Sequence, residues 1–466
     1  MKPLLCEMNI TSSAEEVYAL IAEEEDSVFL DSAMNIGGLG RYSFIARNPF
    51  LVFTSKGSVL SMRTDQGTIT QEGNPFEKLK ELLETYSINK MAEYPPLMGG
   101  VIGYFGYDMG YLLEEIPRNT AAESNTPDCC LGFYDTILIF DHDTGKGYIA
   151  GTGFPEKEEE KRIRRAQRRI NEWQVLLRKA QPLGAALQPL FQGECSANFT
   201  KEAYCNMIAQ AIDYIKSGDI FQVNLSQRFS AKLTVPPFEL YRYLRQSNPA
   251  PFAAYLNFPE VIVASASPER YLLLQDRIIE TRPIKGTRPR GKDEKSDQKL
   301  REELRKSEKD NAELVMIIDL ERNDLGRVCE YGSVHVPDLI RLEEYATVFH
   351  LVSTVTGRLA LGKDIMDVIM ASFPGGSITG APKVRAMEII REKEPVERGI
   401  YTGAIGYIDF NGDADLNIVI RTFVIQGEQV HFQVGGGIVV DSVPEEEYQE
   451  TLDKGKALMR ALGYKT

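Results

Sequence analysis

Residues Tyr401–Val440 read YTGAIGYIDFNGDADLNIVIRTFVIQGEQVHFQVGGGIVV, and this stretch indicates how the chain folds. Its three runs of β-branched and aromatic residues follow one another with short polar connections, which is typical of neighbouring antiparallel strands. Similar runs lie upstream at Phe221–Phe229 and Val261–Gln275, and helical patterns separate the groups of strands. The sequence therefore predicts an α+β fold with antiparallel sheets, and not a doubly wound parallel sheet.

The chain as a whole has 466 residues, 43% of them hydrophobic and 26% charged, which is an ordinary composition for a globular protein. This length suits two or more domains, or one large domain built around extended sheets. We divide it into an N-terminal region, residues 1–185, and a second region, residues 198–462. The Pro/Gly/Ala-rich stretch Ala180–Thr200 connects them, and we expect the helix before it to end near Leu187.

Charge and cysteine usage exclude several classes of protein. The formal net charge of −14 disfavours nucleic-acid binding, and the basic run Lys157–Trp173 alternates in sign like a solvated helix face. The six cysteines form no CxxC pair, so we expect neither a zinc site nor a disulfide framework. No apolar run approaches the roughly 20 residues of a membrane span, and the first residues turn polar too early for a secretory signal. We expect a cytoplasmic protein.

Two motifs resemble known sites and fail on one residue each. FPGGSITGAPKVRAMEII, Phe373–Ile390, has glycines at phosphate-loop spacing, but Ala381 stands where the lysine is required and Lys383 comes too late. A plain helix start and an anion-binding turn both stay open for this motif. DCCLGFYD resembles the nucleophile elbow of a glutamine amidotransferase, but Asp128 replaces the glycine of the strained turn. We therefore expect buried thiols there and no glutaminase site.

Acidic residues near the C-terminus recur at helical spacing. Glu447, Glu450 and Lys454 lie at i, i+3 and i+7, so they project from one face of the last helix. Glu313 belongs to a long charged helix that we expect at about residues 296–320. The two helices could direct oxygen ligands at one Mg²⁺, and solvated helix faces with ion pairs are the alternative. Lys285, in the loop TRPIKGTRPRG, reads on spacing alone as a surface lysine.

Five long motifs, in order, resemble the chorismate-utilising enzymes, which make anthranilate, aminodeoxychorismate, isochorismate and salicylate. The resemblance covers about residues 198–462. It implies a large mixed α/β chorismate-binding fold, with antiparallel sheets packed as a sandwich, helices outside and two interwoven subdomains. The motifs are TRPIKGTRPRG (281–291), DNAELVMIIDLERNDLGRV (310–328), FPGGSITGAPKVRAMEII (373–390), YTGAIGYIDFNGDADLNIVIRT (401–422) and GGGIVVDSVPEEEYQETLDKGKA (435–457).

Within that family, PIKGT with its lysine resembles component I of aminodeoxychorismate synthase, whereas anthranilate synthases typically carry alanine there. The resemblance implies that chorismate and ammonia give 4-amino-4-deoxychorismate, a precursor of 4-aminobenzoate and folate. Lys285 would be the covalent nucleophile and Glu269 the general acid. Gln222 stands where the water-activating members carry a lysine base, which argues against isochorismate and salicylate synthesis. The alternatives are anthranilate synthase component I and a non-catalytic chorismate- or tryptophan-binding protein.

The same resemblance implies the ligands and the partner. Mg²⁺ would be held by Glu313 and Glu450, with Glu447 beside them. Because the chain has no glutaminase site, ammonia would be free or would come from an amidotransferase subunit in a heterodimer. The residues implied to bind the substrate are His350, Ser377, Tyr401, Arg421, Gly436, Gly437 and Lys454.

The segment FLDSAMNIGGLGRYSFIARNP, Phe29–Pro49, corresponds to the region where the family can hold tryptophan. The motif is only partly similar. It implies a tryptophan site at Asp31, Ser32, Tyr42 and Ser43, where the ligand would be either a feedback inhibitor or a tightly bound structural ligand.

Overall fold

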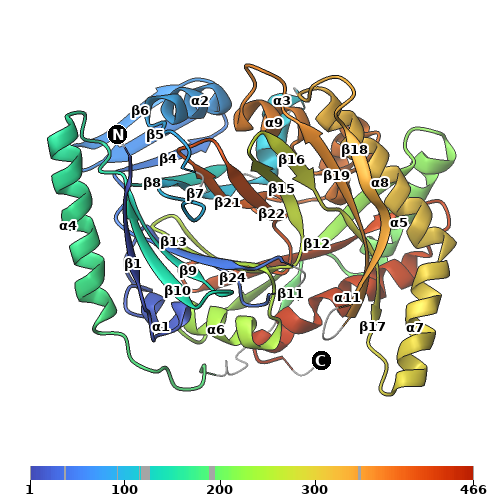
Figure 1. The fold of residues 1–466 in the computed structure, drawn as a ribbon. Coiled ribbons are helices and arrows are strands. Elements are labelled where there is room, and N and C mark those ends of the chain that lie inside the picture. The colour runs from blue at the N-terminus through green and yellow to red at the C-terminus, as the bar shows by residue number, and fades with distance from the viewer. Residues whose placement is uncertain are drawn as a thin grey trace.

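The computed structural model describes residues 2–35, 38–91, 93–114, 116, 126–187, 195–344 and 348–464. Within these residues, two twelve-stranded antiparallel sheets face each other, with helices outside them (Figure 1). The mixed α/β fold with antiparallel sheets is thus confirmed. None of the helices in this part of the chain is both long and apolar enough to cross a membrane.

The first sheet has the order β1-β10-β9-β3-β2-β13-β14-β23-β24-β12-β11, with β20 also paired to β12. Its strands come from both halves of the chain, since β2 pairs with β13 across more than 200 residues of sequence. The strands are β1 (Leu4–Met8), β2 (Ser27–Asp31), β3 (Tyr42–Ala46), β9 (Thr136–Asp141), β10 (Lys146–Gly151), β11 (Ser196–Ala197), β12 (Gln222–Lys232), β13 (Phe252–Phe258), β14 (Val261–Ser267), β20 (Gly380–Ala381), β23 (Thr422–Gln426) and β24 (Gln429–Ile438).

The second sheet has the order β17-β19-β16-β15-β22-β21-β7-β8-β4-β5-β6, with β18 also paired to β19. It too mixes the two halves, because β21 pairs with β7. The strands are β4 (Leu51–Lys56), β5 (Val59–Thr64), β6 (Gly67–Glu72), β7 (Gly100–Phe105), β8 (Cys129–Tyr134), β15 (Arg270–Gln275), β16 (Ile278–Thr281), β17 (Ile284–Pro289), β18 (His335–Glu344), β19 (Val348–Arg358), β21 (Ala404–Asp409) and β22 (Ala414–Ile418).

The helices cover the outer faces and connect the strands. Helix α11 packs against β24, α5 and α6, and α8 packs against β17, β18 and β19. The helices are α1 (Ala14–Tyr18), α2 (Pro75–Thr85), α3 (Gly110–Leu113), α4 (Glu159–Leu177), α5 (Lys201–Lys216), α6 (Pro237–Ser247), α7 (Glu294–Lys306), α8 (Glu308–Gly326), α9 (Ile365–Ser372), α10 (Lys383–Lys393) and α11 (Pro444–Ala461), with 3-10 turns η1 (Tyr107–Met109) and η3 (Gly376–Ile378).

Three apolar cores hold these layers together. One lies between the sheets and includes Val28, Ile102, Val263 and Ile405. A second fills the space under α1, α4, α6 and α11, and the third joins the second sheet to α2, α5, α8, α9 and α10. Cys129 and Cys130 are fully buried in β8, as expected for structural thiols.

Local boundaries differ from the sequence-based expectation in three places. Helix α4 ends at Leu177 and not near Leu187. The expected helix at 296–320 is two helices, because Ser307 has extended backbone (ψ 106°) and its side chain caps α8 by accepting from the amide of Asp310. The run LNIVIRTFVIQ is also two strands in different sheets, and the chain turns between them at Arg421, where φ is +52°. The predicted domain boundary adjoins residues 188–194, which lie outside the described residues.

Candidate active site

Lys285 and Glu269 meet at one residue, Ser377. The Lys285 side chain starts from β17 and its Nζ donates to the Ser377 carbonyl oxygen at 3.0 Å. The Ser377 hydroxyl in turn donates to Glu269 Oε1 at 2.9 Å. Lys285 is half-buried and Glu269 is 6% exposed, so Lys285 is not the exposed lysine that its spacing alone would indicate. A turn that is distant in sequence holds both groups.

The backbone around Lys285 explains why it reaches inward. The pairing of β17 with β19 has a bulge between Lys285 and Thr287, and Gly286 adopts φ +76° there. A Cβ at Gly286 would approach side-chain atoms of Leu304 and Asp310 to 2.9 Å. Glycine is therefore required at this bulge, both for the backbone angle and for the close approach of α7 and α8.

Burial moves both ionisable groups toward their neutral forms. It lowers the pKa of Lys285 below its ordinary value, although the carboxylates of Glu313 and Glu269 oppose that shift. Burial also raises the pKa of Glu269, and the Ser377 hydrogen bond and the charge of Lys285 oppose the change. An uncharged amine is a nucleophile and a protonated carboxyl is an acid, so these directions suit covalent attack with acid assistance.

A buried ion pair fixes the start of α10, the helix that follows the turn carrying Ser377. Lys383, the first residue of α10, contacts Asp324 at 2.5 Å and donates to the Ser372 carbonyl at 2.6 Å. The lysine of the FPGGSITGAPK motif is thus a structural residue that ties α10 to α8 and α9. This agrees with the rejection of a phosphate loop.

Three further residues of the expected substrate site differ in their surroundings. Arg421 is half-buried, influences Glu269 electrostatically, and its side chain makes no hydrogen bond or ion pair with the described residues. His350 shares a hydrogen bond of 2.9 Å with Thr287, and burial, with Arg421 nearby, lowers its pKa to about 4. Tyr401 lies on the wall of a cavity of about 60 Å³, and its ring is under Arg398, which donates to the Ile378 carbonyl next to Ser377. We define Lys285, Glu269, Ser377 and Arg421 as the lysine cluster.

Two adjacent glycines of β24 allow polar side chains to approach the strand from different directions. A Cβ at Gly437 would lie 2.5 Å from Gln222 Nε2, and one at Gly436 would lie 3.3 Å from Glu447 Oε2 and 3.4 Å from Glu450 Oε1. Gln222 is fully buried, and neither amide atom has a hydrogen-bond partner in the described part of the chain. Such a group costs stability unless a ligand satisfies it.

The acidic residues of α11 converge as the helical spacing predicts. Glu447 and Glu450 approach the same point at Gly436, and Lys454 contacts Glu450 at 2.7 Å and donates to the Gly435 carbonyl. Burial raises the pKa of Glu447, and the neighbouring Glu450 adds to the effect. Burial also raises the pKa of Glu313 on α8, where Glu450 contributes as well.

The side chains of Glu313, Glu447 and Glu450 have donor atoms that suit Mg²⁺. They supply only carboxylate oxygens, the donors that Mg²⁺ prefers, and their like charges disfavour one another without a cation. No three such ligands among the described residues stand close enough to form a complete cage. Mg²⁺ is commonly bound by one or two carboxylates together with oxygens of its substrate, and this set of residues fits that pattern.

A second, larger cavity of about 870 Å³ opens on the other side of the strand that follows Glu269. Asp31, Ser32 and Tyr42 line it, as the tryptophan motif predicts. Ser43 is not part of this wall: it is fully buried, accepts from the Ser32 amide and contacts His142 at 2.7 Å. Ser43 thus supports the wall from behind.

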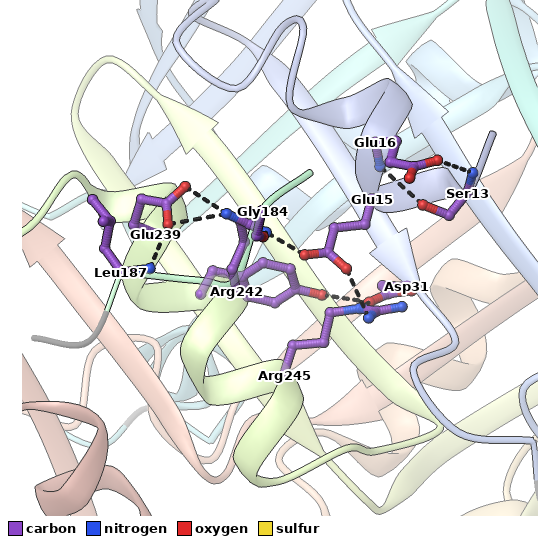
Figure 2. Close-up of polar contacts among 10 residues, drawn as sticks. Ser13, Glu15, Glu16, Asp31, Gly184, Leu187, Glu239, Arg242 and Arg245 are labelled. Atoms are coloured by element: carbon purple, nitrogen blue, oxygen red, sulfur yellow. Dashed lines mark hydrogen bonds and ion pairs between the residues drawn. The ribbon is translucent and has the colours of Figure 1, made fainter. Parts of the chain in front are cut away.

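Every charged residue that lines the large cavity has an ion-pair partner. Arg270 is held by Asp415 and Glu280 at 2.9 Å each, and Asp31 pairs with Arg245. Figure 2 shows that Arg245 also reaches Glu15, from where the network continues through Arg242 to Glu239. The other pairs are Arg41–Asp141, Lys90–Asp276, Lys90–Asp413 and Arg282–Glu343.

Sequence reasoning missed one polar residue of the site, Asn224. It lies two residues after Gln222 on β12, and its Nδ2 donates to the Ser377 carbonyl at 3.1 Å. Alternate residues of a strand share a face, so the period of two would have placed Asn224 beside Gln222.

Residues 40–460 match the model of the chorismate binding enzyme family. The chain is 40% identical to anthranilate synthase component 1 of Thermus thermophilus, over 96% of its own length and 94% of the relative's. It is 38% identical to aminodeoxychorismate synthase component 1 of Bacillus subtilis, covering 97% and 94%. The crystal structure of anthranilate synthase component I from Streptococcus pneumoniae superposes with a TM-score of 0.77 at 33% identity, covering 92% and 93%.

Proposed function

Because the chain belongs to the family of chorismate-binding enzymes, we propose that it is the synthase component of an aminodeoxychorismate synthase. The reaction would join chorismate and ammonia to give 4-amino-4-deoxychorismate and water. The observation that carries this proposal is the Lys285 amine, half-buried and directed at the Ser377 turn beside Glu269. An anthranilate synthase has no need of a nucleophile at this position.

The proposed chemistry proceeds in two displacements. The neutral Lys285 amine attacks C2 of chorismate, both conjugated double bonds of the ring shift, and the C4 hydroxyl leaves with the proton of Glu269 as water. Ammonia then adds at C4, the double bonds shift back, and the bond between Lys285 and C2 breaks. Glu269 regains a proton from the nitrogen that enters, so the enzyme is unchanged and one water is released. Ser377 holds the nucleophile and the acid at fixed positions throughout, which favours a reaction between well-oriented groups.

Charge explains how an acidic protein would accept a dianion. Arg421 has no anionic partner in the described residues, so its guanidinium is available for a substrate carboxylate. Lys454, together with the backbone amides near Gly436 and Gly437, would act in the same sense. We also place Tyr401 and His350 near the substrate, as the family resemblance implies.

Mg²⁺ would be held by Glu313, Glu447 and Glu450, and when bound it would neutralise the substrate's ring carboxylate. This set supplies the right donors from two helices. The Lys454–Glu450 ion pair keeps Glu450 ionised, since burial tends to raise the pKa of Glu450 and Lys454 more than offsets that effect.

Ammonia would come from a glutamine amidotransferase subunit, in a heterodimer in the cytoplasm. The relatives are named component 1, which implies a second component. Gln222 is neutral and cannot act as the base that activates water, which favours an amine as the final nucleophile. The product would enter 4-aminobenzoate and folate synthesis.

Anthranilate synthase component I is the second candidate, since the Thermus thermophilus relative with that name is as similar as the Bacillus subtilis one. The distinction rests on Lys285.

We further propose that the large cavity binds tryptophan through Asp31, Ser32 and Tyr42, with Ser43 behind them. Its charges are already paired, so a zwitterionic amino acid fits better than a dianion. Isothermal titration with tryptophan, and with alanine as a control, tests this assignment. An equal heat for both would contradict it.

The experiment that tests the main proposal supplies chorismate, Mg²⁺ and ammonium, with and without an added aminodeoxychorismate lyase. We expect 4-aminobenzoate only when the lyase is present. Direct appearance of fluorescent anthranilate would replace our proposal with the second candidate. No product of either kind, with intact binding of chorismate, would favour a binding protein.

A further inference from the structure

Asn224 and Lys285 donate to the same acceptor. Asn224 Nδ2 lies 3.1 Å from the Ser377 carbonyl oxygen and Lys285 Nζ lies 3.0 Å from it. The two donors come from different sheets, β12 and β17. A carbonyl oxygen has two lone pairs, so these two bonds fill its capacity.

The backbone of Asn224 is fixed on both of its polar atoms. Its amide donates to the Thr379 carbonyl at 2.8 Å, and its own carbonyl accepts from Arg398 at 2.8 Å. Arg398 is 3% exposed and also donates to the Ile378 carbonyl at 3.1 Å. The backbone of Asn224 is thus tied to the two residues that follow Ser377, directly to Thr379 and through Arg398 to Ile378, and its side chain is held in place relative to Lys285.

We propose that Asn224 is a positioning residue for the Lys285 amine. By occupying one lone pair of the Ser377 carbonyl, it leaves a single site for one N–H of Lys285. An amine anchored through one N–H keeps its own lone pair directed away from that carbonyl, free for attack. This role rests on the proposed function, since it presumes that Lys285 is a nucleophile.

Asn224 would position the Lys285 amine without adding a charge beside it. The charged groups that act on Lys285 come from other elements: Glu269 beside β15, Glu313 on α8, and Glu450 and Lys454 on α11. A carboxylate at position 224 would add a negative charge to this set and hold the amine protonated. A neutral side chain of similar size would remove the anchor alone. These two substitutions therefore have different consequences.

The first measurement is steady-state kinetics of Asn224→Leu and Asn224→Asp with ammonium as the nitrogen source. For Asn224→Leu we expect kcat to fall about 10- to 100-fold, as for the loss of one buried hydrogen bond, while KM for chorismate changes less than about threefold. For Asn224→Asp we expect a larger loss that is partly recovered as the pH rises. A purely structural role predicts equal losses for the two variants, with no dependence on pH.

The second measurement does not depend on turnover. Trace acetylation with acetic anhydride at pH 8, followed by peptide mass spectrometry, compares Lys285 with the exposed lysines of the same sample. We expect Lys285 to react several-fold more slowly in both Asn224→Leu and Asn224→Asp than in the parent enzyme, and the Leu variant tests the anchor itself, because the Asp carboxylate slows acetylation by its charge alone. If the parent makes no aminodeoxychorismate and yet the reactivity of Lys285 falls in this way, the proposed function fails and the positioning role stands.

Asn257 supplies the matched control. It is a buried asparagine whose Nδ2 also donates to backbone carbonyls, those of Ala22 and Glu24, each at 3.0 Å. We expect Asn257→Leu to lower the melting temperature without changing the reactivity of Lys285. If Asn224→Leu does not fold, Asn224→Ser takes its place in the acetylation assay. Unchanged Lys285 reactivity in the folded Asn224 variants, or an equal change in the Asn257 variant, would overturn the inference.

Discussion

The lysine cluster and the large cavity lie on opposite sides of one peptide bond, between Glu269 and Arg270, and they treat charge in opposite ways. Arg270 faces the cavity and is held by Asp415 and Glu280. Glu269 faces the cluster, where neither it nor Lys285 forms an ion pair with the described residues. Buried charges that form ion pairs are compatible with a stable cavity wall. Buried charges without partners lower the stability of the fold unless a bound ligand pairs with them. Under the proposed function, this difference would distinguish a cavity that binds a zwitterion from a site that acts on an anionic substrate.

The largest expected effect comes from removing the unpaired amine. Lys285→Ala should lower aminodeoxychorismate formation on the order of 10⁴-fold, as for the loss of other covalent nucleophiles. The free energy of unfolding should change by less than about 0.5 kcal/mol, because the lysine contributes one hydrogen bond and its burial carries a desolvation cost. Product assays and urea denaturation check both parts. Parent-level product formation would rule out the covalent role.

The next effect tests the shifted pKa values. Attack needs neutral Lys285, so the rate should rise as pH increases through the lowered pKa of this residue. Acid assistance needs protonated Glu269, so the rate should fall as pH increases through its raised pKa. The two requirements give a bell-shaped profile of kcat/KM. Glu269→Gln should lower the rate about 10²- to 10⁴-fold and remove the alkaline limb, and a retained alkaline limb would assign that limb to another group.

A pair of arginines separates the two regions directly. Arg421→Met should raise KM for chorismate about 10- to 100-fold, the equivalent of a lost charged hydrogen bond, with little change in stability. Arg270→Met should destabilise the fold by about 3 kcal/mol, because it strands Asp415 and Glu280, and should leave KM almost unchanged. Kinetics and chemical denaturation of both variants provide the test. The same pattern in both variants would break the comparison between cluster and cavity.

The sequence predicts the parts of this arrangement that depend on local pattern. Neighbouring strand-like runs with short connections indicated antiparallel sheets, and the spacing of Glu447, Glu450 and Lys454 placed them on one face of a helix. The break at Ser307 escaped prediction because charged residues continue on both sides of it. The sequence also did not predict that the N-terminal and C-terminal regions share both sheets. Pairings such as β2 with β13 depend on contacts between residues far apart in sequence.

The active site follows the same rule. The motifs PIKGT and SPER, read against the family, pointed to Lys285 and Glu269. The meeting of both at Ser377 depends on backbone and side-chain atoms of a turn about 100 residues away, and no pattern in the sequence encodes it. The role that the resemblance assigns to Tyr401 stays a prediction, since the structure shows only that this residue lines a cavity of about 60 Å³ and contacts Arg398.

The smallest effect on turnover is expected at a carboxyl behind the cluster, where the change is in stability: Glu321 on α8, which accepts a hydrogen bond from Thr281. Burial raises its pKa from 4.5 to about 8. A carboxyl with a raised pKa stabilises the fold fully below its unfolded pKa, and that contribution is lost as pH rises through the folded value. Glu321→Gln, which keeps the shape and stays neutral, should therefore stay within about 1 kcal/mol of the parent at pH 5 and exceed its free energy of unfolding by about 4 kcal/mol at pH 9. Urea denaturation at both pH values measures this difference, and Glu308→Gln, an exposed position on the same helix, is the control. A gain at pH 9 confined to Glu321→Gln would show that uncompensated burial of acidic groups extends from the cluster into the helix that supports it. Equal behaviour of the two variants would limit the unpaired charges to the residues that meet the substrate.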